Sequence, residues 1–250
     1  MYFPTTHWSL LAKATLNGET EARSALDELC RRYWKPLNQF IRARNYSQAE
    51  AQDLTQEFLL HLMEHGTFRR SDPFRGKFRS FLLGALANFL SHERERRLAQ
   101  KRGGEVPHLS IDTLGAEQQL SDPRLQNEEV AAFDRAWALT IVRAALDHVE
   151  RDYVAAGKAE LFIILRGFLP GVGPATHYEE AATRAGMSIA ALNSEVHRLR
   201  KQFRERLCAE VTGTVSAPHE LDEELSHLYR VLIDRGTDFG PGPKVRPEKT

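Results

Sequence analysis

Tyr178 to Arg206 read YEEAATRAGMSIAALNSEVHRLRKQFRER, and this stretch predicts two helices joined by a tight turn. Ala182 is small enough to let the second helix approach the first, and Gly186 can adopt the positive φ that the turn needs. Ser188 stands where it can cap the second helix, and Leu192 can fill the core that both helices share. The spacing therefore favours a helix-turn-helix, with an ordinary helical hairpin carrying a basic outer face as the alternative.

The second of these helices has two distinct faces. A buried stripe at steps of four, three and four residues is formed by Leu192, Val196, Leu199 and Phe203. A polar face at i, i+3, i+4 and i+7 is formed by Ser194, His197, Arg198 and Lys201. Hydroxyl, imidazole and basic groups on a protruding face suit the phosphates and base edges of a DNA major groove.

Helical patterns also fill the N-terminal part of the chain. The capping box Ser47-Gln48-Ala49-Glu50 predicts a helix that begins there and stops at Gly66. Its buried stripe is expected to be Ala51, Leu54, Phe58 and Leu62. A second long helix, broken at 101–104, has an apolar face formed by Phe78, Phe81, Leu82, Ala85, Leu86 and Phe89.

The whole chain is predicted to be all-α, with two helical domains joined by an acidic flexible linker. The linker is polar, carries Pro107 and Pro123, and has little core of its own. After it, an amphipathic helix is expected over 128–154, and a loop at 169–174 precedes two short helices. The predicted parts are a first domain (1–104), the linker (105–127), a helix-turn-helix domain (128–212) and a C-terminal extension with one helix and a disordered tail (213–250).

Charges are sorted along a chain whose formal net charge is zero. Residues 31–102 carry 15 Lys and Arg against 7 Asp and Glu, a net charge of +8. Residues 105–135 have a net charge of −5, and residues 193–207 return to +3. Two basic blocks separated by an acidic one indicate a protein that touches a polyanion at two places.

Composition narrows the class of protein. With 42% hydrophobic and 27% charged residues, the chain has the balance of a globular protein. No apolar run approaches the roughly 18 residues of a membrane span, and the start of the chain lacks the pattern of a signal peptide. The only cysteines, Cys30 and Cys208, lie far apart in helical sequence, which is typical of reduced cytosolic thiols. We therefore expect a cytoplasmic protein without a membrane partner.

An acid-amide patch interrupts the first basic block. Asp53, Gln56 and Glu57 occupy i, i+3 and i+4 of the capped helix, on the side away from Leu54 and Phe58. Such a patch does not suit DNA, but it suits docking to a basic protein surface. Taken by itself, it could also be an ordinary solvated helix face.

These residues resemble a known family. Asp53-Leu54-Thr55-Gln56-Glu57-Phe58 is similar to the polymerase-clamp-binding motif of sigma-70 family factors. Gly76 to Leu82, followed by Ala87-Asn88 and Arg94 to Arg97, resembles the promoter-melting segment of that family. The layout resembles the extracytoplasmic-function (ECF) subgroup, and in particular a long variant with a C-terminal extension. The stretches that resemble this variant are Thr5 to Leu10, Cys30 to Trp34, Lys101 to Gly104 and His197 to Arg200.

The resemblance implies a transcription initiation factor that performs no covalent chemistry, so no enzyme activity, cofactor or metal is expected. Its implied partners are core RNA polymerase, through the clamp and flap, and promoter DNA; an anti-sigma factor is left open. Clamp binding would fall to Asp53, Gln56 and Glu57. The −10 element would be read by Phe78, Arg79, Phe81, Asn88, His92, Arg94, Arg96 and Arg97. The −35 element would be read by Asn193, Ser194, His197, Arg198, Arg200 and Lys201. The acidic linker would mimic nucleic acid in the polymerase channel.

Two features depart from the family pattern. Residues 146–176 are longer than the usual approach to the DNA-reading hairpin, and Ala185 stands where the family usually has a larger aliphatic residue. The expected helix at 221–232 is absent from minimal members. It either folds back on a basic surface and restrains DNA binding, or simply caps its domain.

Two rival interpretations remain. His61-Leu62-Met63-Glu64-His65 fits the H-x-x-E-H zinc pattern, since histidines four apart on a helix can share a metal. However, Gly66 ends the helix at once, and no second acidic motif follows. The other rival is a stand-alone helix-turn-helix regulator that binds DNA without joining polymerase.

Overall fold

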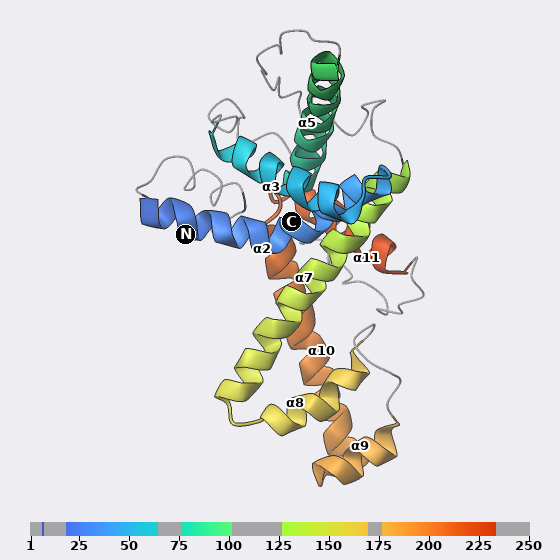
Figure 1. The fold of residues 1–250 in the computed structure, drawn as a ribbon. Helices are drawn as coiled ribbons and strands as arrows, with labels where there is room; N and C mark the ends of the chain where they lie inside the picture. Colours follow the sequence, from blue (N-terminus) through green and yellow to red (C-terminus); the bar gives the residue numbers. More distant parts are fainter. Residues whose placement is uncertain (1–6, 8–18, 65–76, 102–126, 170–176, 234–250) are drawn as a thin grey trace. The chain divides into compact units, whose positions relative to one another are not determined.

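The computed structural model describes residues 7, 19–64, 77–101, 127–169 and 177–233. These residues form eight α-helices and one short 3-10 helix, with no strand among them (Figure 1). The prediction of an all-α fold is confirmed. Within the same residues, no helix combines the length and the apolar character needed to cross a membrane.

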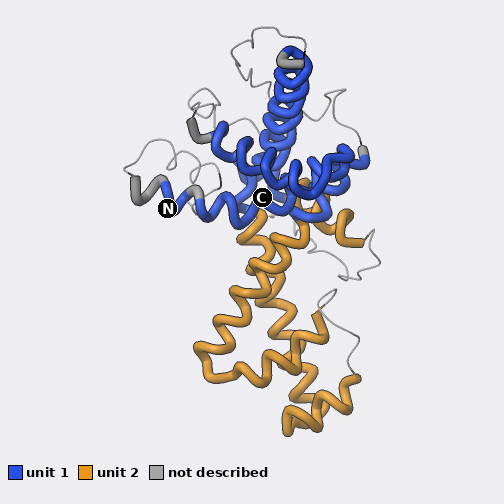
Figure 2. Tube along the Cα trace, viewed as in Figure 1, with its two compact units in different colours: residues 1–137, 212–221 blue, residues 138–211, 222–250 orange. Residues whose placement is uncertain are grey.

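The chain divides into two compact units, each assembled from two stretches of sequence (Figure 2). Unit 1 comprises residues 1–137 and 212–221, and unit 2 comprises residues 138–211 and 222–250. These units differ from the predicted domains, because residues 128–137 and 212–221 belong with the N-terminal part of the chain. The predicted linker lies almost wholly outside the described residues.

Unit 1 contains α2 (Glu19–Ala43), α3 (Gln48–Glu64), α5 (Phe78–Lys101) and the start of α7 (Asn127–Ala155). The capping box forms as predicted at the start of α3. The backbone N–H of Ser47 donates to the Glu50 carboxylate over 3.0 Å, and the backbone N–H of Glu50 donates to the Ser47 hydroxyl over 3.3 Å. The predicted buried stripe of α3 is also confirmed, and its members are Ala51, Leu54, Phe58 and Leu62.

The first half of α5 is the centre of unit 1. Every residue from Phe78 to Leu90 is buried, including the charged Arg79 and the polar Asn88. A helix that is apolar all round has to be covered on every side. Part of that cover comes from the start of α7, where the Asp134 carboxylate lies 3.2 Å from the Arg79 guanidinium.

A segment from the far end of the sequence completes this core. We call residues 212–221 the return segment. The backbone N–H of Phe78 donates to the Thr214 carbonyl over 3.0 Å, and that of His7 donates to the Gly213 carbonyl over 2.8 Å. Because the first N–H groups of a helix have no partner within it, the Thr214 carbonyl caps the start of α5. Thr214 and Val215 are buried, as expected of residues inside a core.

His7 is held in the same place by aromatic contacts. Its Nδ1 lies 2.7 Å from the Tyr33 hydroxyl, and its ring meets the rings of Tyr33 and Phe78 edge-on. Burial lowers the pKa of His7 to about 3, with a smaller contribution from the positive charge of Arg32. His7 is therefore neutral near pH 7 and acts as a core residue.

Unit 2 contains the rest of α7, then α8 (Ala159–Leu165), the 3-10 helix η1 (Arg166–Phe168), α9 (Tyr178–Ala185) and α10 (Ile189–Thr212), followed by most of α11 (Glu220–Ile233). The helices predicted over 128–154 and 221–232 are confirmed as α7 and α11. The prediction of two short helices after residue 174 is wrong for the second, because α10 has 24 residues. Its apolar stripe continues past Phe203 through Leu207 and Val211, so the helix keeps a buried face over its whole length.

Candidate functional site

The first candidate surface is the outer face of α3. Asp53, Gln56 and Glu57 are all exposed, while Leu54 and Phe58 on the opposite side are buried. The structure therefore presents the three predicted side chains together on one helix face. The apolar stripe behind them holds that face in a fixed orientation.

One residue of this face was missed by the sequence analysis. Leu60 lies seven residues after Asp53, which places it on the same side of α3, and it is 45% exposed. An apolar side chain at the edge of a polar patch adds contact area that a protein partner can bury. The spacing of seven residues from Asp53 could have indicated this position. However, the sequence pattern alone did not distinguish Leu60 from the buried leucines near it. We call Asp53, Gln56, Glu57 and Leu60 the α3 face.

The start of α3 is fixed by charge as well as by hydrogen bonds. Accepting hydrogen bonds from Ser47 lowers the pKa of Glu50, with a smaller contribution from Arg97. The Arg97 guanidinium lies 4.0 Å from the Glu50 carboxylate, so the capping box of α3 contacts the charged end of α5.

The second candidate surface is the charged end of α5. Arg94 is exposed, and no ion pair joins it to another described residue. Arg96 and Arg97 share the Glu93 carboxylate at 2.8 and 4.0 Å, and His92 lies 3.7 Å from Glu95. These four predicted −10 residues remain accessible on the surface of unit 1.

The other four predicted −10 residues are not on this surface. Phe78, Arg79, Phe81 and Asn88 are at most 8% exposed. Phe78 packs against Tyr33 and Phe81, with ring centres 5.1 and 6.1 Å away, and Arg79 is engaged with Asp134. A side chain buried in the core cannot contact a DNA strand. These four residues are therefore removed from the predicted −10 surface.

The turn between α9 and α10 has the local geometry that the sequence predicts. Gly186 adopts a φ of 62°. The backbone N–H of Met187 donates to the Ala182 carbonyl over 3.0 Å, and that of Gly186 donates to Thr183 over 3.2 Å. This pair of bonds is the Schellman pattern of a helix that ends in a left-handed glycine. The Ser188 hydroxyl then accepts the backbone N–H of Ala191 over 3.2 Å, which caps α10.

The two faces of α10 also separate as predicted. The buried stripe consists of Leu192, Val196, Leu199 and Phe203. The six candidate −35 residues are all exposed, and they are Asn193, Ser194, His197, Arg198, Arg200 and Lys201. Arg198 pairs with Glu195 at 2.7 Å, but more than half of its side chain is exposed, so a stronger anion can displace this partner.

Arg200 differs from its neighbours because it already has a structural partner. Its Nε and Nη2 atoms both donate to the Phe168 carbonyl, over 3.2 and 3.1 Å. Phe168 ends η1 and packs against Tyr178, whose ring centre lies 4.6 Å away. Arg200 therefore fixes α10 to the segment that precedes α9, and we assign it a positioning role.

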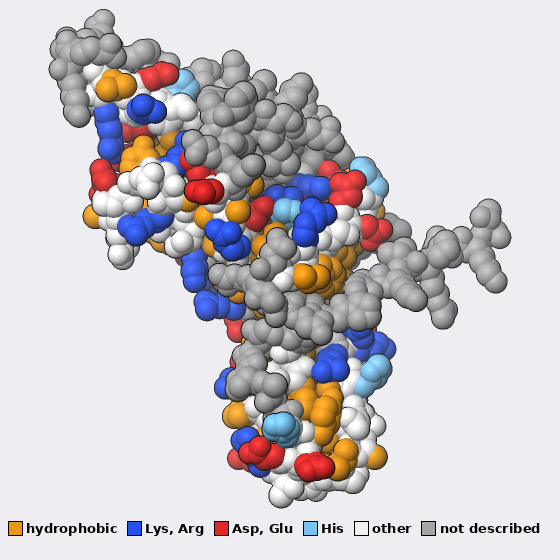
Figure 3. Space-filling view, turned by 90° about the vertical axis from the view of Figure 1, so that its right-hand side faces the viewer, with side chains coloured by type: hydrophobic (Ala, Val, Ile, Leu, Met, Phe, Trp, Pro, Cys, Tyr) orange, Lys and Arg blue, Asp and Glu red, His pale blue; other side chains and the backbone are white. Residues whose placement is uncertain are grey.

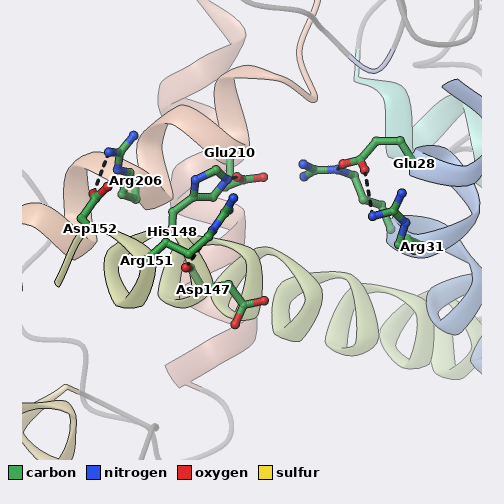
Figure 4. Close-up of polar contacts among 9 residues, drawn as sticks. Glu28, Arg31, Asp147, His148, Arg151, Asp152, Arg206 and Glu210 are labelled. Atoms are coloured by element: carbon green, nitrogen blue, oxygen red, sulfur yellow. Dashed lines mark hydrogen bonds and ion pairs between the residues drawn. The ribbon is translucent and has the colours of Figure 1, made fainter. Parts of the chain in front are cut away.

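Two polar contacts also join α10 to α7 within unit 2 (Figure 4). Arg206 lies 2.7 Å from Asp152, and His148 lies 3.3 Å from Glu210. On the face drawn in Figure 3, the basic side chains shown in colour are interspersed with acidic ones.

The described residues offer no metal centre. No group of three or more His, Cys, Asp or Glu side chains among them is placed to hold an ion. His61 lies on α3, but His65 of the proposed zinc pattern lies outside the described residues. Cys30 in α2 and Cys208 in α10 lie in helices, as predicted, and are not joined by a disulfide. Burial raises the pKa of both thiols.

No protein-family model, curated protein or solved structure matches the chain.

Proposed function

We propose that this chain is a sigma factor of the ECF subgroup, which binds core RNA polymerase and directs it to promoter DNA. The observation that carries the proposal is the exposed α3 face. An acid-amide patch inside a basic stretch is poorly suited to a nucleic acid, because carboxylates repel phosphates. It is well suited to a basic protein surface such as the polymerase clamp that the sequence resemblance implies.

The geometry around α10 supports the DNA-binding half of the proposal. The Gly186 turn, the Ser188 cap and the buried stripe of α10 agree with a helix-turn-helix made of α9 and α10. In that arrangement, Ser194, His197, Arg198 and Lys201 would enter the major groove at the −35 element. His92, Arg94, Arg96 and Arg97 would contact the −10 region through phosphates and unpaired bases.

The proposed role involves binding and positioning only. The α3 face would hold the factor on the polymerase, and the two DNA surfaces would select the promoter and favour its opening. The polymerase would perform all covalent chemistry. Residues 105–126, proposed to enter the polymerase channel, lie outside the described residues.

In vitro transcription tests the polymerase-binding half. Glu57→Arg should weaken binding to core polymerase by more than about tenfold and abolish initiation at a specific promoter, because a like charge facing a basic surface costs several kcal/mol. Asp53→Ala should act in the same direction. Glu160→Arg, the same charge change at an exposed position of α8, is the control and should leave initiation intact.

The same assay separates this proposal from a stand-alone regulator. Tight and specific DNA binding without core polymerase, unaffected by Glu57→Arg, would favour the regulator and contradict the sigma-factor proposal.

A second prediction concerns the reading face of α10. Arg198→Ala should lower discrimination between correct and altered −35 sequences by about 1–3 kcal/mol, as loss of a base-edge contact does. Arg200→Ala removes the same charge from the same helix, but it should lower affinity for all sequences alike, because Arg200 holds α10 to Phe168. Equilibrium binding to duplexes that differ at single base pairs measures both effects. Equal losses on every sequence for Arg198→Ala would remove Arg198 from the reading face.

A further inference from the structure

A basic and aromatic stripe on α2 is not used by the proposed function. Arg31, Trp34, Lys35, Asn38 and Arg42 follow one another at steps of three, one, three and four residues, which places them on one side of the helix. We call these five residues the α2 stripe. The opposite side of α2 is in the core of unit 1, where Tyr33, Leu37, Phe40 and Ile41 are buried.

The cations of this stripe are available to a ligand. No ion pair or hydrogen bond joins the Lys35 or Arg42 side chain to another described residue. Arg31 lies 3.8 Å from Glu28, but its side chain is 75% exposed (Figure 4). Glu28 is engaged more closely by Arg32, at 2.6 Å. The charged end of α5 differs, because several of its cations already share carboxylates.

Trp34 lies among these cations and is 36% exposed. Single exposed apolar residues are common and need no explanation. Here the informative feature is the combination, because an indole next to exposed ammonium and guanidinium groups matches the chemistry of a single nucleic-acid strand. An unstacked base can lie on the indole while its phosphates meet the cations. A duplex keeps its bases stacked and offers the indole no ring face.

We propose that the α2 stripe binds single-stranded DNA, with a base stacked on Trp34 and phosphates paired with Lys35, Arg42 and Arg31. Asn38 lies between Trp34 and Arg42, but it is half-buried and its amide reaches Thr55 at 3.5 Å, so it has no part in the contact. The choice of DNA over RNA rests on the proposed function, because a factor that opens a promoter works beside an exposed DNA strand. The α2 stripe is positively charged, so it would be repelled by the basic protein surface that we propose as the partner of the α3 face.

The test uses the full chain without polymerase and measures the anisotropy of a labelled oligo(dT) strand. Trp34→Ala should weaken binding about 5- to 150-fold, which is the effect expected for the loss of one stacked base. Trp34→Phe keeps a ring and should retain most of the affinity. Lys35→Ala should reduce the slope of log K against log salt by about 0.7, as loss of one phosphate contact to a single strand does. Ile163→Ala removes an exposed apolar side chain from α8 and should change nothing.

Three outcomes would overturn the proposal. One is an unchanged oligo(dT) affinity in Trp34→Ala, and another is tighter binding of oligo(rU) than of oligo(dT) by the unmodified chain. The third is loss of core-polymerase binding by Trp34→Ala with oligonucleotide binding intact, which would make the stripe a protein-docking surface. Glu57→Arg should leave oligo(dT) binding unchanged, so failure of the sigma-factor proposal and failure of this one give different results.

Discussion

Replacing Asp134 with alanine should lower the free energy of unfolding by about 3–5 kcal/mol, the usual effect of removing one partner from a buried ion pair. Asp134 and Arg79 lie 3.2 Å apart, and their side chains are only 7% and 5% exposed. In the variant, the Arg79 guanidinium would remain inside unit 1 without that carboxylate. Its position over the Trp137 ring, 5.7 Å from the centre, cannot replace a full negative charge.

Urea denaturation of three variants measures this effect. Asp152→Ala breaks the Asp152–Arg206 pair, which is shorter at 2.7 Å but has both side chains 45% exposed, so a cost below about 1 kcal/mol is expected. Replacing Arg79 and Asp134 together by leucine should recover much of the loss, because a well-packed apolar pair is often no worse than a buried ion pair. A cost for Asp134→Ala no larger than that for Asp152→Ala would show that Arg79 is not held as the structure places it.

Features set by neighbouring residues were predictable from the sequence. The capping box at Ser47, the left-handed turn at Gly186 and the cap at Ser188 each depend on groups three to five residues apart. The buried stripes of α3 and α10 follow from helical periodicity alone. For the same reason, the α3 face and the outer face of α10 could be predicted as exposed surfaces, with Leu60 as the residue missed.

Features set by distant residues were not predictable. Arg79 was expected on the surface because an arginine is rarely buried unless it is paired, and its partner Asp134 lies far along the chain. No pattern among neighbouring residues predicts the Arg79–Asp134 pair. The same is true of the contact between Phe78 and the return segment. One indication did exist: FLLGALANFL, residues 81–90, is apolar on every side of the helix, and such a helix must be covered all round. Asn88 lies within that stretch, so its burial could have been predicted.

The return segment carries the second large expected effect. Val215→Asp should destabilise unit 1 by about 3 kcal/mol or more, because it places an unpaired carboxylate at a position only 4% exposed. The loss of protection from hydrogen exchange should appear at residues far from Val215 in the sequence. The backbone N–H groups of Phe78 and His7 donate to Thr214 and Gly213, so both should exchange with solvent much faster. Hydrogen exchange resolved by residue measures this effect.

His219→Asp is the matched control for this prediction. It introduces the same side chain four residues later at an exposed position, so exchange at Phe78 and His7 should stay slow. Loss of protection confined to α9 and α10 in Val215→Asp, with α5 unaffected, would contradict the assignment of the return segment to unit 1. The experiment also bears on the hypothesis that the C-terminal helix restrains DNA binding. If unit 1 needs residues 212–215 in order to fold, deleting from Ser216 onward tests α11, whereas deleting from Thr212 onward removes part of the unit that carries the α3 face.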